Sequence, residues 1–376
     1  MPGYELVDKK ERKAVEQLFK EGGVLFAHGF GNLRKKYHVR EFEKAICKKL
    51  NAKYALAVTS GTAAIKIALK AMGVKRGDEV ITQAFNFIAT IEAILDIGAK
   101  PIIANVERSL NIDVEDVKKL ISNKTKVIIP VHMLGVAADL RGLKKVIGKR
   151  KIKILEDNCE AAGGKYNNKY LGTIGKAGVF SFDFGKTITT GEGGLILTDD
   201  KKIMKYSKEY HDHGHENNKK YSRGEDTRSI YGFNYRMTEM QGVIGKVQLK
   251  KLEYILRNNK MRYYQLHKIL KNKFKIRNIP SNSTPNFDTF IFFEENTNQR
   301  KKILKKIKKN NFETKNLPDA VKWHCSAYWD HALPVRQVNR TLKTKDLLST
   351  AIAIPINLKR TLADYKRLAE SVLSVN

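Results

Sequence analysis

The chain has 376 residues, 42% of them hydrophobic, and its 71 Lys and Arg against 39 Asp and Glu give a formal net charge of +32. This apolar content excludes intrinsic disorder, and the length exceeds the roughly 250 to 300 residues of a typical single core, which favours two domains. No apolar stretch approaches the roughly 20 residues of a membrane span, and charged residues at 8–13 exclude a secretory signal peptide. Three scattered cysteines indicate neither a disulfide framework nor a zinc site, so we expect a cytoplasmic protein with no membrane partner.

Short apolar runs alternate with helical patterns between residues 53 and 200, which is typical of an α/β domain with a largely parallel sheet. We expect strands at 79–85, 101–106, 126–131, 151–155, 177–182 and 194–198. We expect helices at 62–72, 88–97, 114–121 and 143–147, the first after a Ser-Gly-Thr start signal. In such sheets, ligands bind beyond the carboxyl ends of the strands.

Longer helical patterns begin after residue 236. We expect helices at 239–256 and 261–270, strand-like runs at 289–293 and 351–356, and a final helix at 361–373. We therefore predict a larger domain at residues 1–249 and a smaller C-terminal α+β domain at residues 250–376. No repeat or low-complexity linker separates them, so we expect the two to pack together.

The positive charge is spread along the chain, which contains 53 Lys and 18 Arg. The densest run, at 300–309, has seven basic residues among ten, but Ile303, Leu304 and Ile307 recur at helical spacing. This pattern is typical of an amphipathic helix with a solvated lysine face. A polyanion site and a site for small anionic ligands are the alternatives. The dispersed charge favours a solvated surface, and we expect no nucleic-acid partner.

A single lysine, Lys186, follows the apolar run 177–182 and precedes a glycine-rich turn at 191–194. Burial and a nearby cation can depress the pKa of a lysine, which makes its amine a nucleophile at neutral pH. On its own, Lys186 is equally one of 53 lysines in a loop.

Two further features suit the same chemistry. Asp157 ends the apolar run 152–157, where its carboxylate could hold a pyridinium N–H. The tripeptide Ser60-Gly61-Thr62 opens a predicted helix whose free N–H groups suit a phosphate, although it is also a common N-cap. Pyridoxal phosphate (PLP) requires a lysine, a carboxylate for its ring nitrogen and an anion site, so the three features together indicate a PLP site.

These motifs resemble the DegT/StrS-type sugar aminotransferases, PLP enzymes with the aspartate aminotransferase fold (fold type I). The resemblance covers nearly the whole chain and rests on the segments 59–64, 77–80, 87–90, 130–135, 156–157, 178–182, 186, 190–194 and 234–237. It implies an α/β fold, with a large domain around a mostly parallel sheet and a smaller C-terminal α+β domain.

The resemblance also implies roles for individual residues. Lys186 is expected to form the Schiff base with PLP and to carry a proton between cofactor and substrate. Asp157 is expected to pair with the ring nitrogen, and Phe87 to stack on the ring, although Phe87 is equally compatible with core packing. The implied cofactor-binding residues are Gly61, Thr62, Phe87, Asp157, Glu160, Ser181, Lys186 and Asn234.

The resemblance implies more specific roles for Ser181, Asn234 and Glu160. Ser181, with Gly61 and Thr62, is expected to bind the phosphate, although a serine there also suits a plain strand edge. Asn234 is expected to reach the phosphate from the other subunit, which implies a homodimer with shared active sites. Glu160 stands where the family often has Gln beside the phenolic oxygen of PLP. Its carboxylate either shares a proton with that oxygen or turns towards the substrate.

The family also contains dehydratases in which His replaces the Schiff-base lysine, so the presence of Lys186 favours transamination. The implied reaction takes an amino group from L-glutamate to a keto-sugar for amino-sugar or cell-surface polysaccharide biosynthesis, lipopolysaccharide included. The sugar is either a nucleotide-linked keto-deoxyhexose or a keto-sugar acid such as an 8-oxo ulosonate. The alternatives are a PLP-dependent sugar dehydratase and a polyanion-binding protein on this scaffold.

The segment 211–215 reads His-Asp-His-Gly-His. It resembles a metal cluster in composition, but it lacks a helical ligand spacing, and we expect no metal site. The resemblance favours a place near the substrate entrance. Basic residues that follow, which either meet an anionic substrate or are simply solvated, are Lys219, Lys220, Arg223 and Arg228.

Overall fold

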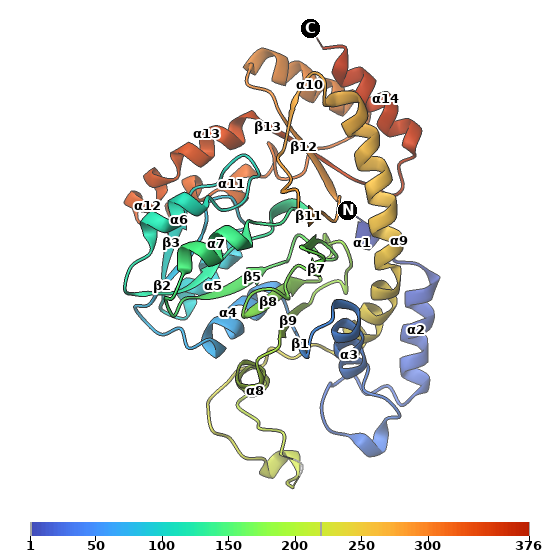
Figure 1. Cartoon of the computed structure of the whole chain (residues 1–376). Helices are drawn as coiled ribbons and strands as arrows, with labels where there is room; N and C mark the ends of the chain where they lie inside the picture. Colours follow the sequence, from blue (N-terminus) through green and yellow to red (C-terminus); the bar gives the residue numbers. More distant parts are fainter. Residues whose placement is uncertain (1, 219, 376) are drawn as a thin grey trace.

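The structure is a computed structural model that describes residues 2–218 and 220–375. The larger, N-terminal part of the chain is built around a seven-stranded sheet (Figure 1). Its strands lie in the order β1-β9-β8-β5-β4-β2-β3, and β9 alone among them runs antiparallel to its neighbours. They are β1 Tyr54–Val58, β2 Glu79–Gln83, β3 Lys100–Ala104, β4 Thr125–Ile129, β5 Lys153–Asp157, β8 Ala177–Ser181 and β9 Gly194–Thr198. This arrangement confirms the expected α/β fold with a mostly parallel sheet.

Helices cover both faces of this sheet because side chains alternate along each strand. In β9, Ile196 packs in the core that α4, α5 and α8 share, whereas Leu195 and Leu197 pack on the opposite face with α3 and α9. Helices α6 and α7 extend that second layer. These helices are α3 His38–Leu50, α4 Gly61–Ala71, α5 Ala89–Asp96, α6 Val114–Leu120, α7 Leu140–Ile147, α8 Lys201–Tyr210 and α9 Glu239–Leu270. The predicted strands and helices between residues 62 and 198 are confirmed with small shifts of their ends, whereas β1, α3 and α8 are additional.

Helix α9 is continuous, so the prediction of two helices at 239–256 and 261–270 is wrong. The polar residues at 257–260 suggested a break, but Asn259 is fully buried and its Nδ2 donates a hydrogen bond to the backbone oxygen of Asn286 at 3.2 Å. A buried polar group with a partner does not interrupt a helix. The predicted domain division at 249/250 falls inside α9 and stays a prediction.

The C-terminal part is built on an antiparallel sheet in the order β10-β12-β13, which packs on α9, α10 and α14 (Figure 1). Its elements are β10 Lys275–Ile276, β12 Thr289–Phe293, α10 Thr297–Lys309, β13 Ala351–Pro355 and α14 Leu362–Leu373. A small third sheet contains β6 Lys165–Tyr166, β7 Lys169–Tyr170 and β11 Ser283–Thr284. The remaining helices are α1 Pro2–Glu5, α2 Lys9–Lys20, α11 Val321–His324, α12 Val335–Arg340 and α13 Leu342–Thr350, with 3₁₀ turns at Gly31–Leu33, Met133–Gly135, Arg223–Glu225 and Ser326–Tyr328.

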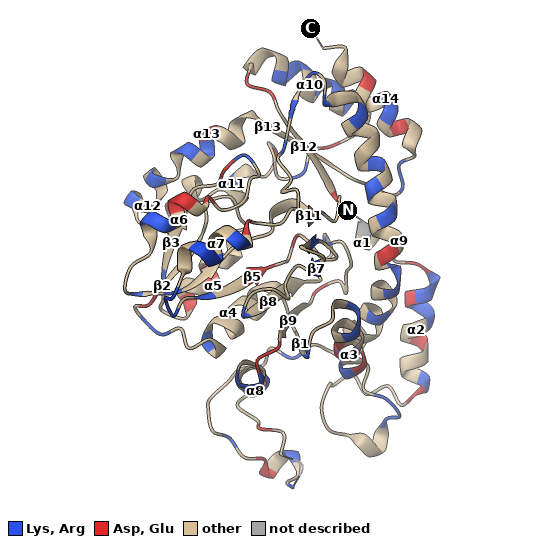
Figure 2. Ribbon diagram, in the orientation of Figure 1, with Lys and Arg blue, Asp and Glu red and all other residues tan. Residues whose placement is uncertain are grey.

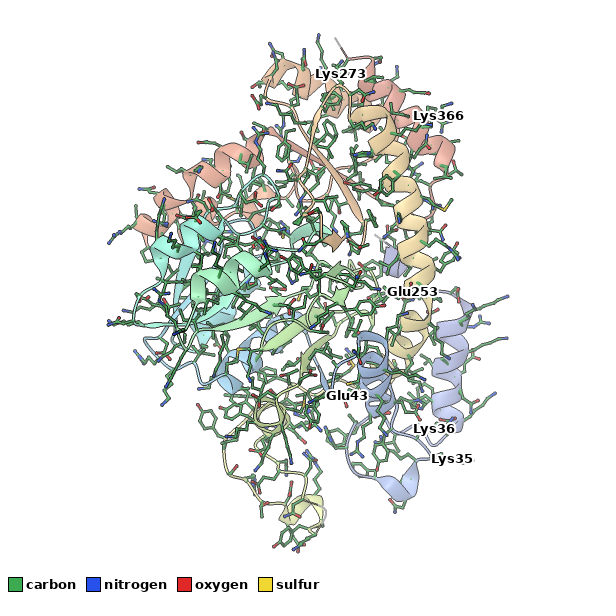
Figure 3. The ribbon with its side chains drawn as sticks, viewed as in Figure 1. Lys35, Lys36, Glu43, Glu253, Lys273 and Lys366 are labelled. Carbon is green, nitrogen blue, oxygen red and sulfur yellow. The ribbon has the colours of Figure 1, made fainter. Side chains whose placement is uncertain are left out.

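Basic residues lie along helices from one end of the molecule to the other (Figure 2). Ile303 and Ile307 of α10 are buried and its lysines are largely exposed, as the amphipathic pattern predicted. Some lysines contact other parts of the chain: Nζ of Lys273, which is labelled in Figure 3, donates a hydrogen bond to the backbone oxygen of Leu373 at 3.0 Å. Across the described residues, no helix is both long enough and apolar enough to cross a membrane.

Residues 211–236 form an arm that connects α8 to α9 and extends away from the sheet (Figure 1). Two buried carboxylates hold the arm together. Asp212 pairs with Arg223 and Arg236, and Asp226 accepts hydrogen bonds from backbone N–H groups at 217 and 218. These contacts hold the described residues of the arm together, and near its end the backbone N–H of Thr59, next to β1, donates to the backbone oxygen of Tyr235 at 3.0 Å.

Candidate active site

A cavity of about 430 Å³ lies at the carboxyl ends of the parallel strands. The end of β5 and the end of β8 contribute Asp157 and Ser181, and the N-terminus of α4, which follows β1, contributes Gly61 and Thr62. Residues that share this cavity are Ser60, Gly61, Thr62, Asn86, Phe87, Thr90, Asp157, Cys159, Glu160, Ser181, Lys186, Lys315, Asn316 and His324. The location agrees with the rule that ligands of such sheets bind beyond the carboxyl ends of the strands.

The N-terminus of α4 forms one end of the cavity. Ser60 caps the helix, because its Oγ accepts a hydrogen bond from the N–H of Ala63 at 3.1 Å. The first N–H groups of a helix have no acceptor within it and carry a partial positive charge. A Cβ on Gly61 would lie 3.0 Å from Cβ of Ser181 and 3.2 Å from Sγ of Cys159, so a side chain there would crowd this end. The cavity therefore offers an anion a helix terminus at a position that favours glycine.

Asp157 is 3% exposed, and both of its carboxylate oxygens are held. Oγ1 of Thr90 donates a hydrogen bond to Oδ2 at 3.0 Å, and the backbone N–H of Cys159 donates to Oδ1 at 3.1 Å. Thr90 belongs to α5, so a contact between two elements of the fold orients the carboxylate. Each oxygen keeps a lone pair for one more donor.

A buried pair of side chains supports the adjoining backbone. Nε2 of His132 lies 3.0 Å from Oε2 of Glu156, and the backbone N–H of Ala138 donates to Nδ1 of His132, which places the proton on Nε2. Glu156 also accepts hydrogen bonds from the N–H groups of residues 172, 174 and 175. Burial raises the pKa of Glu156, but His132 and these N–H groups outweigh it, so that the pKa is lowered. The carboxylate thus ties the turn at 172–175 to β5, beside Asp157.

Lys186 and Glu160 form a partly buried ion pair in which Nζ lies 2.6 Å from Oε1. Burial lowers the pKa of Lys186, but the charge of Glu160 outweighs burial and raises it above its ordinary value. The neighbour of Lys186 is thus a carboxylate, whereas a depressed pKa would require a nearby cation to dominate. Conversely, burial opposes ionisation of Glu160, and the charges of Lys186 and Lys315 outweigh it and lower its pKa. Neither role expected for Glu160 is tested by these contacts.

The C-terminal part of the chain closes another side of the cavity. Nζ of Lys315 lies 3.4 Å from Oε2 of Glu160 and 3.3 Å from Oδ2 of Asp288. The imidazole of His324 faces the ring of Phe87 at a centroid distance of 5.4 Å. Phe87 is 45% exposed, so core packing does not account for it.

Three residues of the cavity were not predicted from the sequence, namely Thr90, Lys315 and His324. No local motif marks Lys315, in the loop after α10, or His324, the last residue of α11, and both lie more than 125 residues after Lys186. A signal for Thr90 was present in the segment 87–90, which belongs to the motifs of the resemblance.

Seven of the eight predicted site residues meet in this cavity, and Asn234 does not. Asn234 is exposed on the arm, where a backbone bridge pairs it with Asp212. The arm also presents exposed rings of Tyr221, Tyr231 and Phe233. A role of Asn234 at a PLP phosphate therefore requires a second subunit.

The histidines of the arm point to separate partners. Nδ1 of His211 contacts the backbone oxygen of Lys208 at 2.5 Å, Nδ1 of His215 lies 3.2 Å from Oδ2 of Asp226, and His213 is exposed. Within residues 2–218 and 220–375, no group of three or more His, Cys, Asp or Glu could hold a metal ion.

The segment 211–215 lies at the base of the arm and is absent from the cavity of its own chain. Of the basic residues for which substrate contact and solvation were the two alternatives, Arg223 is paired with Asp212, whereas Lys220 and Arg228 are exposed. Lys219 lies outside the described residues.

The chain resembles known proteins in sequence. The sequence model of the DegT/DnrJ/EryC1/StrS aminotransferase family matches residues 12–373. A GDP-perosamine synthase from Vibrio cholerae is 34% identical over 259 residues, which are 68% of this chain and 67% of that protein. The chain spans little more than half the length of two further GDP-perosamine synthases, from Escherichia coli O157:H7 and Caulobacter vibrioides.

Solved structures share the fold over nearly the whole chain. Helicobacter pylori PseC, an aminotransferase involved in the biosynthesis of pseudoaminic acid, matches with a TM-score of 0.81 and 25% identity, covering 98% of this chain and 96% of that one. A GDP-4-keto-6-deoxymannose-3-dehydratase with a trapped PLP-glutamate geminal diamine matches with a TM-score of 0.84 and 25% identity, covering 98% of each chain. The chain therefore belongs to the DegT/DnrJ/EryC1/StrS aminotransferase family, whose enzymes depend on PLP.

Proposed function

We propose that the protein is an aminotransferase that uses PLP to move an amino group from L-glutamate to a keto-sugar. The observation that carries the proposal is the presence of Lys186, the buried carboxylate of Asp157 and the N-terminus of α4 in one cavity. These are the three groups that PLP requires of a protein. The PLP-glutamate adduct trapped in the related dehydratase supports glutamate as the amino donor.

The residues around the cavity fit PLP. We assign the phosphate to Gly61 and Thr62 of α4 and to Ser181, because a Cβ on Gly61 would crowd the space next to Ser181. We assign the ring nitrogen to Asp157, whose oxygens keep lone pairs for one more donor. The exposed ring of Phe87 is the surface on which the cofactor ring would stack. When bound, PLP supplies an electron sink for the charge that develops at the substrate carbon.

The chain's own residues handle the proton. Lys186 is assigned the bond to the cofactor, and its Nζ carries a proton to and from the substrate carbon. Glu160 accepts a hydrogen bond from that nitrogen at 2.6 Å and restricts its orientation. The carboxylate of the buried Asp157, oriented by Thr90, would accept a hydrogen bond from the ring nitrogen.

The acceptor is a keto-sugar in this proposal. The GDP-perosamine synthases among the relatives support a nucleotide-linked keto-deoxyhexose. A keto-sugar acid such as an 8-oxo ulosonate is the second candidate, and a half-reaction screen of the aminated cofactor form against both classes separates them. The fold alone does not distinguish an aminotransferase from the related dehydratase, and the presence of Lys186 favours amine transfer.

The central test is spectroscopic. Full-length protein incubated with PLP should acquire the visible band of lysine-bound PLP and lose it on addition of L-glutamate. Lys186→Ala should abolish both changes, whereas Lys169→Ala, which removes an exposed lysine of β7, should alter neither. A colourless protein, or a Lys186→Ala variant with the wild-type spectrum, would contradict the proposal. Release of water without an aminated sugar would assign the dehydratase activity instead.

A homodimer with shared sites is part of the same proposal. Asn234 lies outside the cavity of its own chain, and three exposed aromatic rings accompany it on the arm. Lys186→Ala and Asn234→Ala should each reduce activity strongly, and their mixture should recover activity because each heterodimer contains one site with both residues intact. A mixture no more active than its components would mean that the site is confined to one chain.

A further inference from the structure

Lys315 is a buried lysine of the cavity to which the proposed reaction gives no role. Its side chain is 8% exposed, and its backbone N–H donates to the backbone oxygen of Ala353 at 2.9 Å, which fixes the loop after α10 to β13. The ammonium group lies within 3.4 Å of two carboxylates, those of Glu160 and Asp288. Burying an ammonium group has a large desolvation cost, which the two carboxylates must offset.

Four charges alternate through this part of the cavity, in the order Lys186, Glu160, Lys315 and Asp288. Glu160 is the only carboxylate with an ion-pair distance to both lysines among the described residues. Oε1 faces Lys186 and Oε2 faces Lys315, so one negative charge serves two cations. The further groups that act on this chain of charges are Cys159 and Asp183 beside Lys186, His324 beside Glu160 and Arg277 near Asp288.

The arrangement affects how easily Lys186 loses its proton. A carboxylate with Lys186 as its single partner would hold the ammonium form tightly, and an ammonium group cannot attack an aldehyde. Lys315 draws on the same carboxylate and also repels a positive charge on Lys186. When the nitrogen of Lys186 is neutral, Lys315 remains as the counter-ion of Glu160, so no buried carboxylate is left unpaired.

We propose that Lys315 is a positioning residue that sets the protonation state of Lys186 through the carboxylate of Glu160. This pairing accounts for a carboxylate at position 160, where the family often has an amide. The proposal rests on the role assigned above to Lys186, and it concerns the amine itself rather than the reaction of the loaded enzyme.

Reductive methylation of the full-length protein without added PLP measures the neutral fraction of the Lys186 amine. Formaldehyde with cyanoborohydride modifies neutral amines, and peptide mass spectrometry reports the rate at Lys186 relative to the exposed Lys169 in the same sample. Below the pKa, the rate at a fixed pH is proportional to the neutral fraction. Lys315→Met should lower the relative rate about tenfold, since a nearby charge shifts a pKa by about one unit. Glu160→Gln should raise it by a similar factor.

Two comparisons separate charge from packing. Loss of packing around Lys315 would open the cavity and speed the methylation of Lys186, whereas loss of its charge slows it. Lys315→Arg keeps the charge and should restore the wild-type rate. An unchanged or faster rate in Lys315→Met overturns the proposal. If Lys315→Met does not fold, as circular dichroism would reveal, Glu160→Gln provides the test, and an unchanged rate in that variant overturns it equally.

The outcome is independent of the proposed reaction. The methylation rates follow the predicted order whether or not the protein transfers amino groups, because PLP takes no part in the labelling. A protein that fails to react with L-glutamate but shows the predicted rates would contradict the proposed function and leave this inference intact. A competent aminotransferase with equal rates in all variants would do the reverse.

Discussion

Thr90 provides a sensitive test of the site, because one hydroxyl connects α5 to the carboxylate of Asp157. The side chain of Thr90 is buried, and its Oγ1 lies 3.0 Å from Oδ2 of Asp157 and 3.3 Å from Oδ1 of Asn86. A hydroxyl has one hydrogen to donate, and the shorter contact with the charged acceptor takes it. Thr90→Val replaces the hydroxyl by a methyl group of similar size, so the packing is preserved and the hydrogen bond is lost.

The size of the effect follows from the kind of bond. A hydrogen bond to a charged group contributes about 2 kcal/mol, and the remaining bond from the N–H of Cys159 keeps Asp157 partly held, so the free energy of unfolding should fall by about that amount. If the same contact orients Asp157 towards the ring nitrogen during the reaction, about 2 kcal/mol corresponds to a roughly 30-fold slower half-reaction with L-glutamate. Urea denaturation measures the first quantity, and stopped-flow absorbance of the PLP form measures the second.

Thr82→Val is the matched control. Thr82 is fully buried in β2, and its Oγ1 donates to the backbone oxygen of Ile129 at 3.0 Å without contacting Asp157. Its Oγ1 also accepts a long hydrogen bond from Nδ2 of Asn86 at 3.5 Å. Loss of the hydroxyl should lower the free energy of unfolding by about 1 kcal/mol and change the half-reaction much less than Thr90→Val, because the bond to Asp157 is kept. Equal half-reaction rates in Thr90→Val and Thr82→Val would refute the assignment of Asp157 to the ring nitrogen through Thr90.

Three further predictions concern stability and cofactor binding. Because the pKa of Glu156 is lowered in the folded state, its carboxylate contributes fully to stability above its unfolded pKa, and this contribution is lost as the pH falls through the folded pKa. Glu156→Gln should therefore be less stable than wild type at pH 7. In urea titrations at acid pH, the variant should lose less stability than wild type does. Gly61→Ala should weaken PLP binding at least about tenfold in equilibrium dialysis, at nearly unchanged thermal stability, because the new Cβ crowds the end of the cavity. Gly135→Ala should unfold at a clearly lower temperature by calorimetry, because φ is +83° and the Cβ would lie 1.9 Å from Oδ1 of Asn286.

Much of the fold could be predicted because its determinants are local. Short apolar runs mark the parallel strands, and the buried patterns of β5 and β8 agree with them. The continuity of α9 could not be predicted in the same way. Whether Asn259 breaks a helix or lies inside one depends on the backbone of Asn286, which is 27 residues away and is brought to it by the fold.

In the candidate site, too, residues in local motifs could be predicted, whereas long-range partners could not. Lys186, Asp157 and Gly61 could be predicted because each belongs to a recognisable local motif. They could be expected to lie close together because the carboxyl ends of parallel strands meet at one edge of the sheet. The pKa of Lys186 could not be predicted, since its direction is decided by Glu160, and the charge of Glu160 is in turn balanced by Lys315 from the C-terminal part. Such long-range electrostatic partners have no sequence spacing of their own.

The net charge of +32 does not reside in the cavity. Two lysines, at 186 and 315, face four carboxylates there, at 157, 160, 183 and 192. The ligands of the proposed reaction are anionic, because PLP carries a phosphate and glutamate carries two carboxylates. Among the described residues, carboxylates therefore outnumber lysines in the cavity of one chain. Lys220 and Arg228 are exposed on the same arm as Asn234, so the homodimer proposed for Asn234 would also bring positive charge towards the cavity of the partner subunit. If the arm contributes in this way, Arg228→Met should raise the KM for glutamate steeply and change kcat little. An unchanged KM would mean that the basic residues of the arm are simply solvated.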